Sequence, residues 1–232
     1  LTLTFSEAID LSTIDVTGIS IQSVGSNGNT AVSIDSDGSV EQINHIVVEI
    51  TPSIAVMNAV KALRTLAIDR ASTYLSVSAA TIKDYANNAL AVIASNAGLQ
   101  ATSYTVDSTN PTISSYSLDM DAGMISITFD ETMDGDSFDV TELVLQSAQG
   151  SGATGYRLTS GTSATTADST VINVTLSLAD ANEIKKAETI GISATTTHLR
   201  FAAGLVNDTA ANRVTAVVAA GAVQVATFTE DS

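Results

Sequence analysis

The chain has 232 residues, of which 44% are hydrophobic, so it is long enough for one or two domains with packed cores. Aromatic residues make up only 4%, Cys is absent, and the formal net charge is −16. This composition excludes disulfides, thiolate catalysis and cysteine-ligated zinc, and it lacks the clustered Lys and Arg that nucleic-acid binding requires. No apolar run reaches the length of a membrane span, so we expect no membrane insertion.

Alternating apolar and polar residues predict short strands along the first half of the chain. The strands are expected near residues 1–5, 19–21, 32–34, 46–50, 74–78 and 99–106. A short helix is predicted to begin at Thr51-Pro52, with proline in its first turn, because apolar residues then recur at helical spacing, at Ile54, Met57, Val60 and Leu63. The segment Asp35-Ser-Asp-Gly38 predicts a hairpin turn and does not form a calcium loop of the EF-hand type.

The same pattern returns in the second half, preceded by one additional strand. Strands are expected near residues 112–120, 124–129, 143–145, 156–158, 171–176, 198–202 and 223–229. Ser177-Leu-Ala-Asp180 resembles a helix capping box and predicts a second short helix. Seven or so short strands in each half, joined by turn-rich links, favour an all-β fold of the sandwich type.

The two halves are copies of one another. A shift of 124 positions aligns residues 1–108 with residues 125–232 without a gap, and 31 of the 108 pairs are identical. A repeat of this length predicts two tandem domains, residues 1–108 and 109–232, each a β-sandwich with one short helix. The linker between them is Asp107-Ser-Thr-Asn-Pro111, in which proline restricts the backbone.

The first domain lacks its opening strand. Residues 109–124 precede the second copy and have no counterpart before Leu1. Either the sequence is a window cut from a longer array and starts within a domain, or a neighbouring chain supplies the missing strand, as in donor-strand polymers. Under both interpretations the expected partners are further copies of the same repeat, in the same chain or in neighbouring chains.

Three motifs resemble those of bacterial-type immunoglobulin-like (Ig-like) repeats in S-layer proteins and large surface adhesins. They are Asp107-x-Thr-x-Pro111, Thr4-Phe-Ser-Glu7-x-x-Asp10, and Ile82-Lys-Asp84-Tyr-Ala-Asn-Asn88 with its repeat at 205–212. Where the last motif has glycine in that family, this chain has Asn87 and Ala211. The resemblance implies a structural or adhesive extracellular array, sometimes stiffened by calcium, and it does not imply an enzyme.

Acidic residues recur at matched positions of the two copies. The candidate calcium ligands are Glu7, Asp10, Asp84, Asp107, Glu131, Asp134 and Asp208. Calcium takes about six to eight oxygen ligands, often carboxylates and carbonyls from loops, so acids at strand ends and in the linker could converge at a domain junction around Asp107. The alternative is that these Asp side chains accept hydrogen bonds from the backbone of their own turns.

The sequence also contains candidate glycosylation sites and paired carboxylates. Asn173-Val-Thr175 and Asn207-Asp-Thr209 are sequons of the N-glycosylation type, so Asn173 and Asn207 are candidate glycan acceptors. Paired carboxylates also serve glycosidases, but such sites usually need aromatic platforms, and this chain has no Trp and five Tyr. We therefore expect no enzymatic activity.

The sequence predicts a structural extracellular module in which tandem Ig-like domains form a stalk, a filament or a surface layer on a cell or a virion. The acidic surface would keep such an array soluble. The alternative is an adhesive module whose exposed loops bind glycans or a partner protein. The low aromatic content argues against that alternative.

Overall fold

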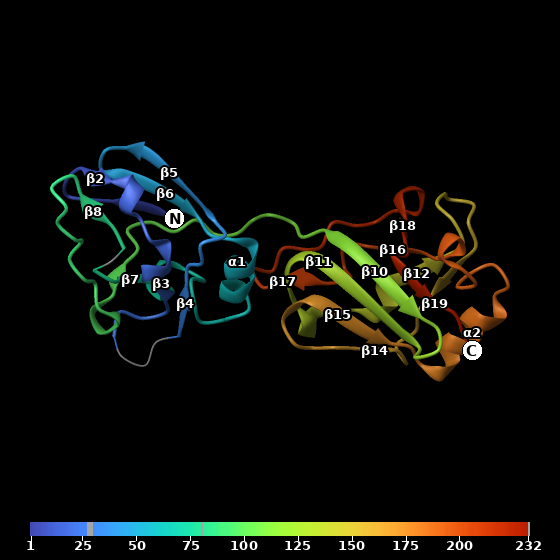
Figure 1. Ribbon diagram of the computed structural model, residues 1–232. Helices are drawn as coiled ribbons and strands as arrows, with labels where there is room; N and C mark the ends of the chain where they lie inside the picture. Colours follow the sequence, from blue (N-terminus) through green and yellow to red (C-terminus); the bar gives the residue numbers. More distant parts are fainter. Residues whose placement is uncertain (27–29, 80, 232) are drawn as a thin grey trace. The chain divides into compact units, whose positions relative to one another are not determined.

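The computed structural model describes residues 1–26, 30–79 and 81–231 and is mainly β, with 35% strand and two short helices (Figure 1). The chain divides into two compact units, Leu1–Val106 and Asp107–Ser232. The linker residue Asp107 therefore belongs to the second unit, although it stands near the end of the first sequence copy.

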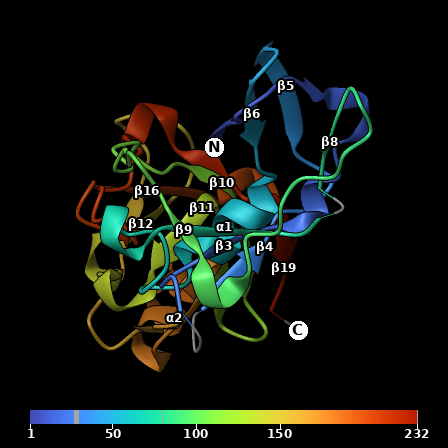
Figure 2. The same ribbon diagram turned by 90° about the vertical axis from the view of Figure 1, so that its left-hand side faces the viewer.

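Unit 1 consists of open antiparallel sheets and one helix. Its strands are β1 (Thr2–Thr4), β2 (Ile9–Asp10), β3 (Ile19–Gln22), β4 (Ala31–Ser33), β5 (Ser39–Asn44), β6 (Val47–Thr51), β7 (Tyr74–Val77), β8 (Lys83–Asp84) and β9 (Leu99–Gln100). The sheets have the orders β1-β6-β5, β4-β3-β7-β9 and β2-β8. Helix α1 (Ile54–Lys61) confirms the helix predicted here, but it begins at the N-cap Ser53, so Pro52 precedes the helix instead of standing in its first turn. Figure 2 shows the β5–β6 hairpin apart from the sheet that contains β3 and β4.

Unit 2 has two larger sheets. Its strands are β10 (Ile113–Asp119), β11 (Met124–Asp134), β12 (Leu143–Gln146), β13 (Gly155–Arg157), β14 (Ser163–Ala164), β15 (Ser169–Thr175), β16 (His198–Phe201), β17 (Asn207–Asp208), β18 (Val223–Gln224) and β19 (Thr227–Thr229). One sheet has the order β14-β15-β11-β10-β19, with β17 also on β11, and the other has the order β13-β12-β16-β18. All pairs are antiparallel except β10 and β19, which run parallel. Helix α2 (Leu178–Lys186) follows β15.

The sequence repeat is also a structural repeat. Strands β3, β4, β7, β8 and β9 begin and end 124 residues before β12, β13, β16, β17 and β18. Two left-handed backbone positions repeat as well, because Ala67 and Asn87 pair with Gly191 and Ala211 at the same interval. The matched strands and similar turns show that the two copies follow the same chain path over these segments.

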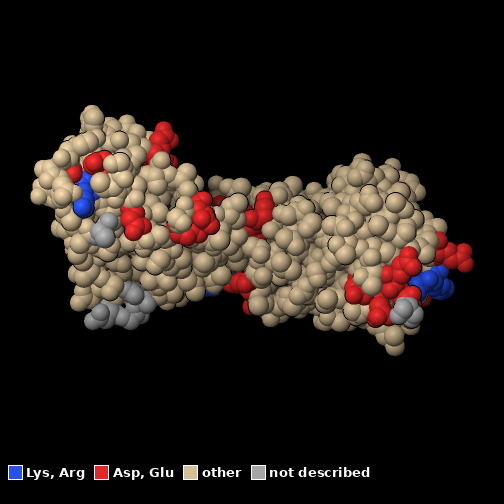
Figure 3. Space-filling view, viewed as in Figure 1, with Lys and Arg blue, Asp and Glu red and all other residues tan. Residues whose placement is uncertain are grey.

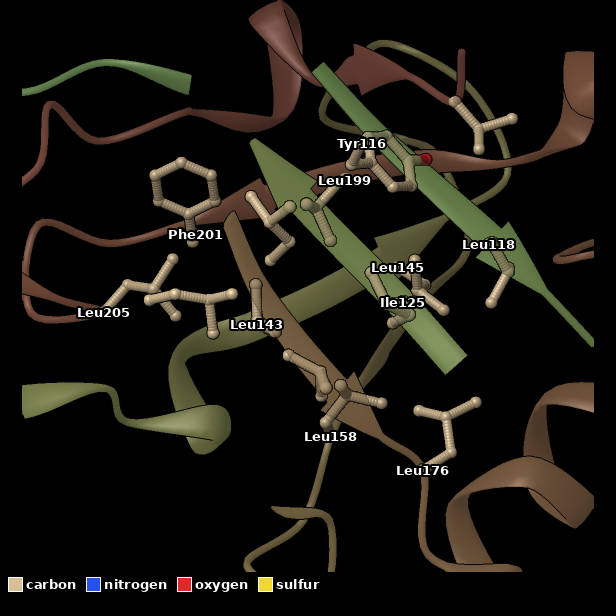
Figure 4. Packing of buried hydrophobic residues seen from close by; sticks show 14 of the residues in the cluster. Tyr116, Leu118, Ile125, Leu143, Leu145, Leu158, Leu176, Leu199, Phe201 and Leu205 are labelled. Atoms are coloured by element: carbon tan, nitrogen blue, oxygen red, sulfur yellow. The ribbon is translucent and has the colours of Figure 1, made fainter. Parts of the chain in front are cut away.

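Alternating side chains of the two sheets of unit 2 form its core. Ile125 and Ile127 of β11 and Leu143 and Leu145 of β12 have no exposed surface. Figure 4 shows side chains from both sheets meeting between them, with Tyr116 and Leu118 of β10 covering one side. Burial of apolar surface contributes about 25 cal/mol per Å², so this contact between the sheets stabilises the unit.

Two strands of unit 2 have no counterpart in the described residues of unit 1. These are β10, which the sequence predicts to be missing there, and β19. The strand expected over residues 99–106 is only β9, whereas the matched segment 223–229 contains both β18 and β19. The physical reason is that β19 pairs with β10, and unit 1 offers no such strand for residues 103–105.

The prediction of a hairpin turn at Asp35–Gly38 is wrong. Strand β4 ends at Ser33 and β5 begins at Ser39, but the two strands belong to different sheets. The side chain of Asp35 does accept the backbone N–H of Asp37, so a local turn forms. It redirects the chain from one sheet to another, which a turn motif alone does not reveal.

Both positions where the Ig-like motif has glycine adopt a left-handed backbone, with φ of 68° at Asn87 and 69° at Ala211. Alanine is strained there and asparagine less so. We expect Ala211→Gly to raise the free energy of unfolding of unit 2 by about 0.5–1 kcal/mol. Urea unfolding measures this change. The neighbouring control Ala210→Gly should instead destabilise, and equal effects of the two substitutions would contradict the prediction.

Candidate metal centre

Three of the predicted acidic residues meet at the start of unit 2. Asp107 lies in the linker, Glu131 in β11 and Asp208 in β17, and their carboxylate oxygens all lie within 4.8 Å of one another. Asp208 is buried, with 1% of its surface exposed, whereas Asp107 is partly exposed. Within the part of the chain that the structure describes, this is the group of acidic residues with metal-ligand spacing.

A bulge in β11 places Glu131. The pairing of β11 with β15 shifts from Thr128 opposite Val171 to Met133 opposite Ser169, so the residues between are out of the regular ladder. Such a bulge bends the strand and re-aims its side chains. Just beyond it, Met133 pairs with Asp208 of β17, which brings the Asp208 carboxylate to the same end of the sheet as Glu131.

Asn212 connects Asp208 to the linker. Its side-chain amide donates to Oδ2 of Asp208 at 2.8 Å and to the backbone carbonyl of Asp107 at 3.1 Å. The backbone N–H groups of Ala210 and Asn212 donate to the other oxygen of Asp208, at 2.9 and 2.7 Å. These bonds fix the carboxylate in one orientation, as outer-shell hydrogen bonds do for metal ligands. Asn212 was not among the predicted site residues, and its match to Asn88 is the only feature of the sequence that points to it.

The linker is held to unit 2 at a second point. The backbone N–H of Thr215 donates to the carbonyl of Pro111 at 2.8 Å. The side chain of Asp107 itself accepts the backbone N–H of Thr109 at 3.0 Å. The linker is therefore an ordered part of unit 2 on both sides of Ser108.

The other predicted ligands lie elsewhere. Asp10 and Asp134 each accept a backbone N–H two residues ahead and so cap 3₁₀ turns. In unit 1, Asp84 accepts the side-chain amide and backbone N–H of Asn88, which lower the pKa of its carboxyl. Glu7 is exposed. For Asp10, Asp84 and Asp134 the structure thus shows the turn chemistry that was the alternative to calcium.

The geometry of the three carboxylates suits a hard divalent cation. At 4.8 Å and an effective dielectric constant of about 20, two carboxylates repel each other by about 3 kcal/mol. A bound Ca²⁺ would replace this repulsion by attraction, and carboxylate and carbonyl oxygens are the ligands that it takes. Asp107, Glu131 and Asp208 are the residues that could hold it.

The two sequon asparagines lie in paired strands. Asn173 is in the middle of β15, is partly buried and accepts the hydroxyl of Ser126 at 2.7 Å. Asn207 is in β17, where its backbone N–H donates to the hydroxyl of Ser137 at 2.9 Å. Glycosylation of either residue stays a prediction.

Comparisons with protein families, with curated proteins and with solved structures give no match. The resemblance to Ig-like repeats therefore rests on the motifs of the sequence. Among the described residues, no helix combines the length and the apolar character needed to cross a bilayer. Acidic residues outnumber basic ones 25 to 9, and Figure 3 shows this excess on the face in view.

Proposed function

We propose that the chain is a structural extracellular module, built of Ig-like repeats joined in tandem, that forms part of a stalk, a filament or a surface layer. The observation that carries this proposal is the 124-residue period shared by sequence and structure. Repeats of one chain path joined by a short ordered linker suit an extended array. The acidic surface keeps such an array soluble through charge repulsion.

Calcium has a defined place in this proposal. Asp107 lies near the end of the first sequence copy, but its carboxylate lies near those of Glu131 and Asp208 in the second unit. A cation held by all three would tie the linker to the unit that follows it. Asp231 has the same position at the end of the second copy and pairs with Lys185 at 2.6 Å.

We expect calcium to raise the melting temperature of unit 2 by about 5 °C at a calcium concentration about ten times the Kd, because an ion that binds only the folded state stabilises it. Differential scanning calorimetry of the full chain with calcium or with a chelator measures the shift. The variant Asp107→Asn/Glu131→Gln should lose the response, whereas the control Asp10→Asn should keep it. Equal melting temperatures with calcium and chelator would remove calcium from the proposal and leave the array untouched.

The mass of the native polypeptide tests the proposal of an array. We expect mass spectrometry of the native protein to show a chain well above 24 kDa that carries further copies of the 124-residue period. A native polypeptide without further copies that also stays monomeric in solution would contradict the array. This result does not depend on whether the carboxylates bind calcium.

A further inference from the structure

One histidine lies buried on the outer face of the smaller sheet of unit 2. In that sheet, β13-β12-β16-β18, Leu145 and Leu199 point into the core, as Figure 4 shows. Because side chains alternate along a strand, His198 of β16 and Gln146 of β12, which lie opposite each other, point to the other face. Both are buried there, with exposed fractions of 7% and 1%.

Two loops cover this outer face. The side-chain amide of Gln146 donates to the carbonyl of Ala148 at 2.6 Å and to that of Ala219 at 3.0 Å. The backbone N–H of Gly150 donates to the same carbonyl of Ala219 at 2.8 Å. The loops are thus tied to each other and to the strand that pairs with β16. We call them the cover loops, residues 147–150 and 219–222.

The imidazole of His198 lies in surroundings that do not suit a positive charge. Among the described residues, Nδ1 of His198 is buried without a hydrogen-bond partner, and so is Nε of Arg200, two residues further along the same face. The charged imidazolium carries an N–H on both nitrogens, so protonation would leave a buried donor at Nδ1 without an acceptor. Desolvation accordingly lowers the pKa of His198 below its ordinary value of 6.5.

No acid on the neighbouring elements offsets this cost. The segments that frame the imidazole contain no Asp, Glu or Lys; they are residues 143–156, 189–206 and 214–229. Their one charged side chain is that of Arg200, and Tyr156 of β13 lies opposite Leu145 and so points to the core. Beyond these segments, Arg157 at the end of β13 pairs with Glu142 at 3.4 Å. A proton on the imidazole would therefore add a second positive charge to a face that already carries one.

Unit 1 has the same arrangement without a group that titrates near neutral pH. Tyr74 stands at the position of His198, and it lies opposite Gln22, the matching glutamine of β3. The side chain of Gln22 donates to the carbonyls of Val24 and Ser95, each at 2.8 Å, which are the matching acceptors. Histidine ordinarily changes its charge between about pH 5 and pH 8, and tyrosine does not. The two units thus differ at the one position that responds to mild acid.

We propose that His198 makes unit 2 sensitive to mild acid: protonation of its imidazole releases the cover loops and destabilises unit 2, whereas unit 1 keeps its stability in the same range. Because the unfolded chain binds this proton more readily than the folded one, the stabilisation is full above about pH 7. It declines as the pH falls through 6.5 toward the pKa of the folded state. The proposal goes beyond the array function and does not require calcium.

The first experiment titrates the wild-type chain by NMR. His45 and His198 give the only imidazole signals, and both can be assigned through the backbone. We expect the signal of His198 to titrate with a midpoint below 6.5, together with the amide signals of the cover loops. A midpoint at or above 6.5 would overturn the proposal. The titration needs no variant, so it decides the matter even where a substitution prevents folding.

The second experiment compares urea unfolding of the full chain at about pH 7.5 and about pH 5.5, on either side of the ordinary pKa of histidine. NMR signals of each unit follow the two units separately. We expect the unfolding constant of unit 2 to rise about three- to tenfold at the lower pH, since one proton is taken up on unfolding. His198→Gln should abolish this rise, whereas the control His45→Gln should keep it. An equal rise in His198→Gln and in the wild type would overturn the proposal.

A further variant copies the arrangement of unit 1 into unit 2. A Cβ at Gly25 would lie 2.9 Å from the ring of Tyr74, and the counterpart of Gly25 in unit 2 is Gln149. Tyrosine at 198 therefore needs glycine at 149. We expect His198→Tyr/Gln149→Gly to protect the amide of Gly150 from hydrogen exchange equally at both pH values, whereas the wild type loses protection there at the lower pH. Unchanged protection of Gly150 in the wild type would overturn the release of the cover loops.

Discussion

Replacing Asp180 by Asn is expected to lower the free energy of unfolding of unit 2 by about 3 kcal/mol. Asp180 has no exposed surface, and its carboxylate accepts hydrogen bonds from four residues of three segments: Tyr156, Thr159, Thr162 and Ser177. These bonds fasten the start of α2 to β13 and to the loop after it. The side chain of Asn has one acceptor oxygen, and its NH₂ group would face hydroxyl groups that donate to the carboxylate in the wild type. Buried polar groups would therefore be left without hydrogen-bond partners.

The same carboxylate gives unit 2 a specific dependence on pH. Desolvation raises the pKa of Asp180, but hydrogen bonds from Thr162, Tyr156, Ser177 and Thr159 outweigh it and lower the pKa to about 2. Because the folded-state pKa lies below the unfolded value of 3.8, the stabilisation is full above about pH 4 and is lost as the pH falls toward 2. The difference corresponds to about 2 kcal/mol. Urea unfolding at pH 6 and at pH 3 should show a smaller pH effect in Asp180→Asn than in the wild type.

Unit 1 supplies the control for this prediction. There Val56 stands in place of Asp180, and Asp35 stands in place of Thr159. Asp35 accepts the hydroxyl of the N-cap Ser53 at 2.6 Å, so the carboxylate serves the same helix start from the loop. We expect Thr159→Asp/Asp180→Val to be more stable than Asp180→Val by about 1–2 kcal/mol. A double variant no more stable than the single one would show that the two carboxylates do not replace each other.

Leu199→Ala is expected to destabilise unit 2 by about 3–4 kcal/mol, whereas Leu75→Ala should destabilise unit 1 by about 1–2 kcal/mol. The two leucines occupy the same position of the repeat, in β16 and β7. Leu199 has no exposed surface, and its removal leaves a cavity in a closed core. Leu75 is already partly exposed, so its removal loses less transfer free energy.

Calorimetry of the full chain, with the two transitions assigned by these variants, measures both changes. Losses of equal size would show that Leu75 is as well covered as Leu199 and would contradict this difference in exposure. A variant in which a copy of residues 109–124 is placed before Leu1 provides a second comparison, because Leu1 aligns with Ile125. In that variant the effect of Leu75→Ala should approach that of Leu199→Ala.

Much of the strand pattern of this chain could be predicted from alternation, because one face of each strand is buried and the other is exposed. Both helices could also be predicted, since capping and helical spacing are local properties. The start at Ser177 was predicted correctly, whereas the first helix begins at Ser53 and not at the predicted Thr51-Pro52. The sheet to which each strand belongs could not be predicted in this way. The turn at Asp35–Gly38 has a local signature typical of hairpins, yet it joins different sheets because the partners of β4 and β5 lie far along the chain. The shortening of the strand expected over 99–106 likewise depends on a partner that lies outside unit 1.

The candidate metal centre shows the same limit. Repetition of acids selected Glu131 and Asp208, and the linker motif selected Asp107, but repetition selected Asp10 and Asp134 equally well. What separates the two groups is the bulge in β11, which gathers Glu131 and Asp208 and leaves Asp134 to cap its own turn. Bulges follow from long-range strand pairing, so the sequence of one strand does not reveal them.

The parallel pairing of β10 with β19 also governs the order in which unit 2 can be completed. These strands open and close the unit in the sequence yet lie side by side in the sheet. As the chain is synthesised from its N-terminus, β10 and β11 can pair at once, but the outer edge of β10 waits for Thr227–Thr229. Contacts between such distant segments form slowly. A nascent chain that stalls before Thr227 therefore carries an unpaired strand beside a nearly finished core, the condition in which β-proteins aggregate.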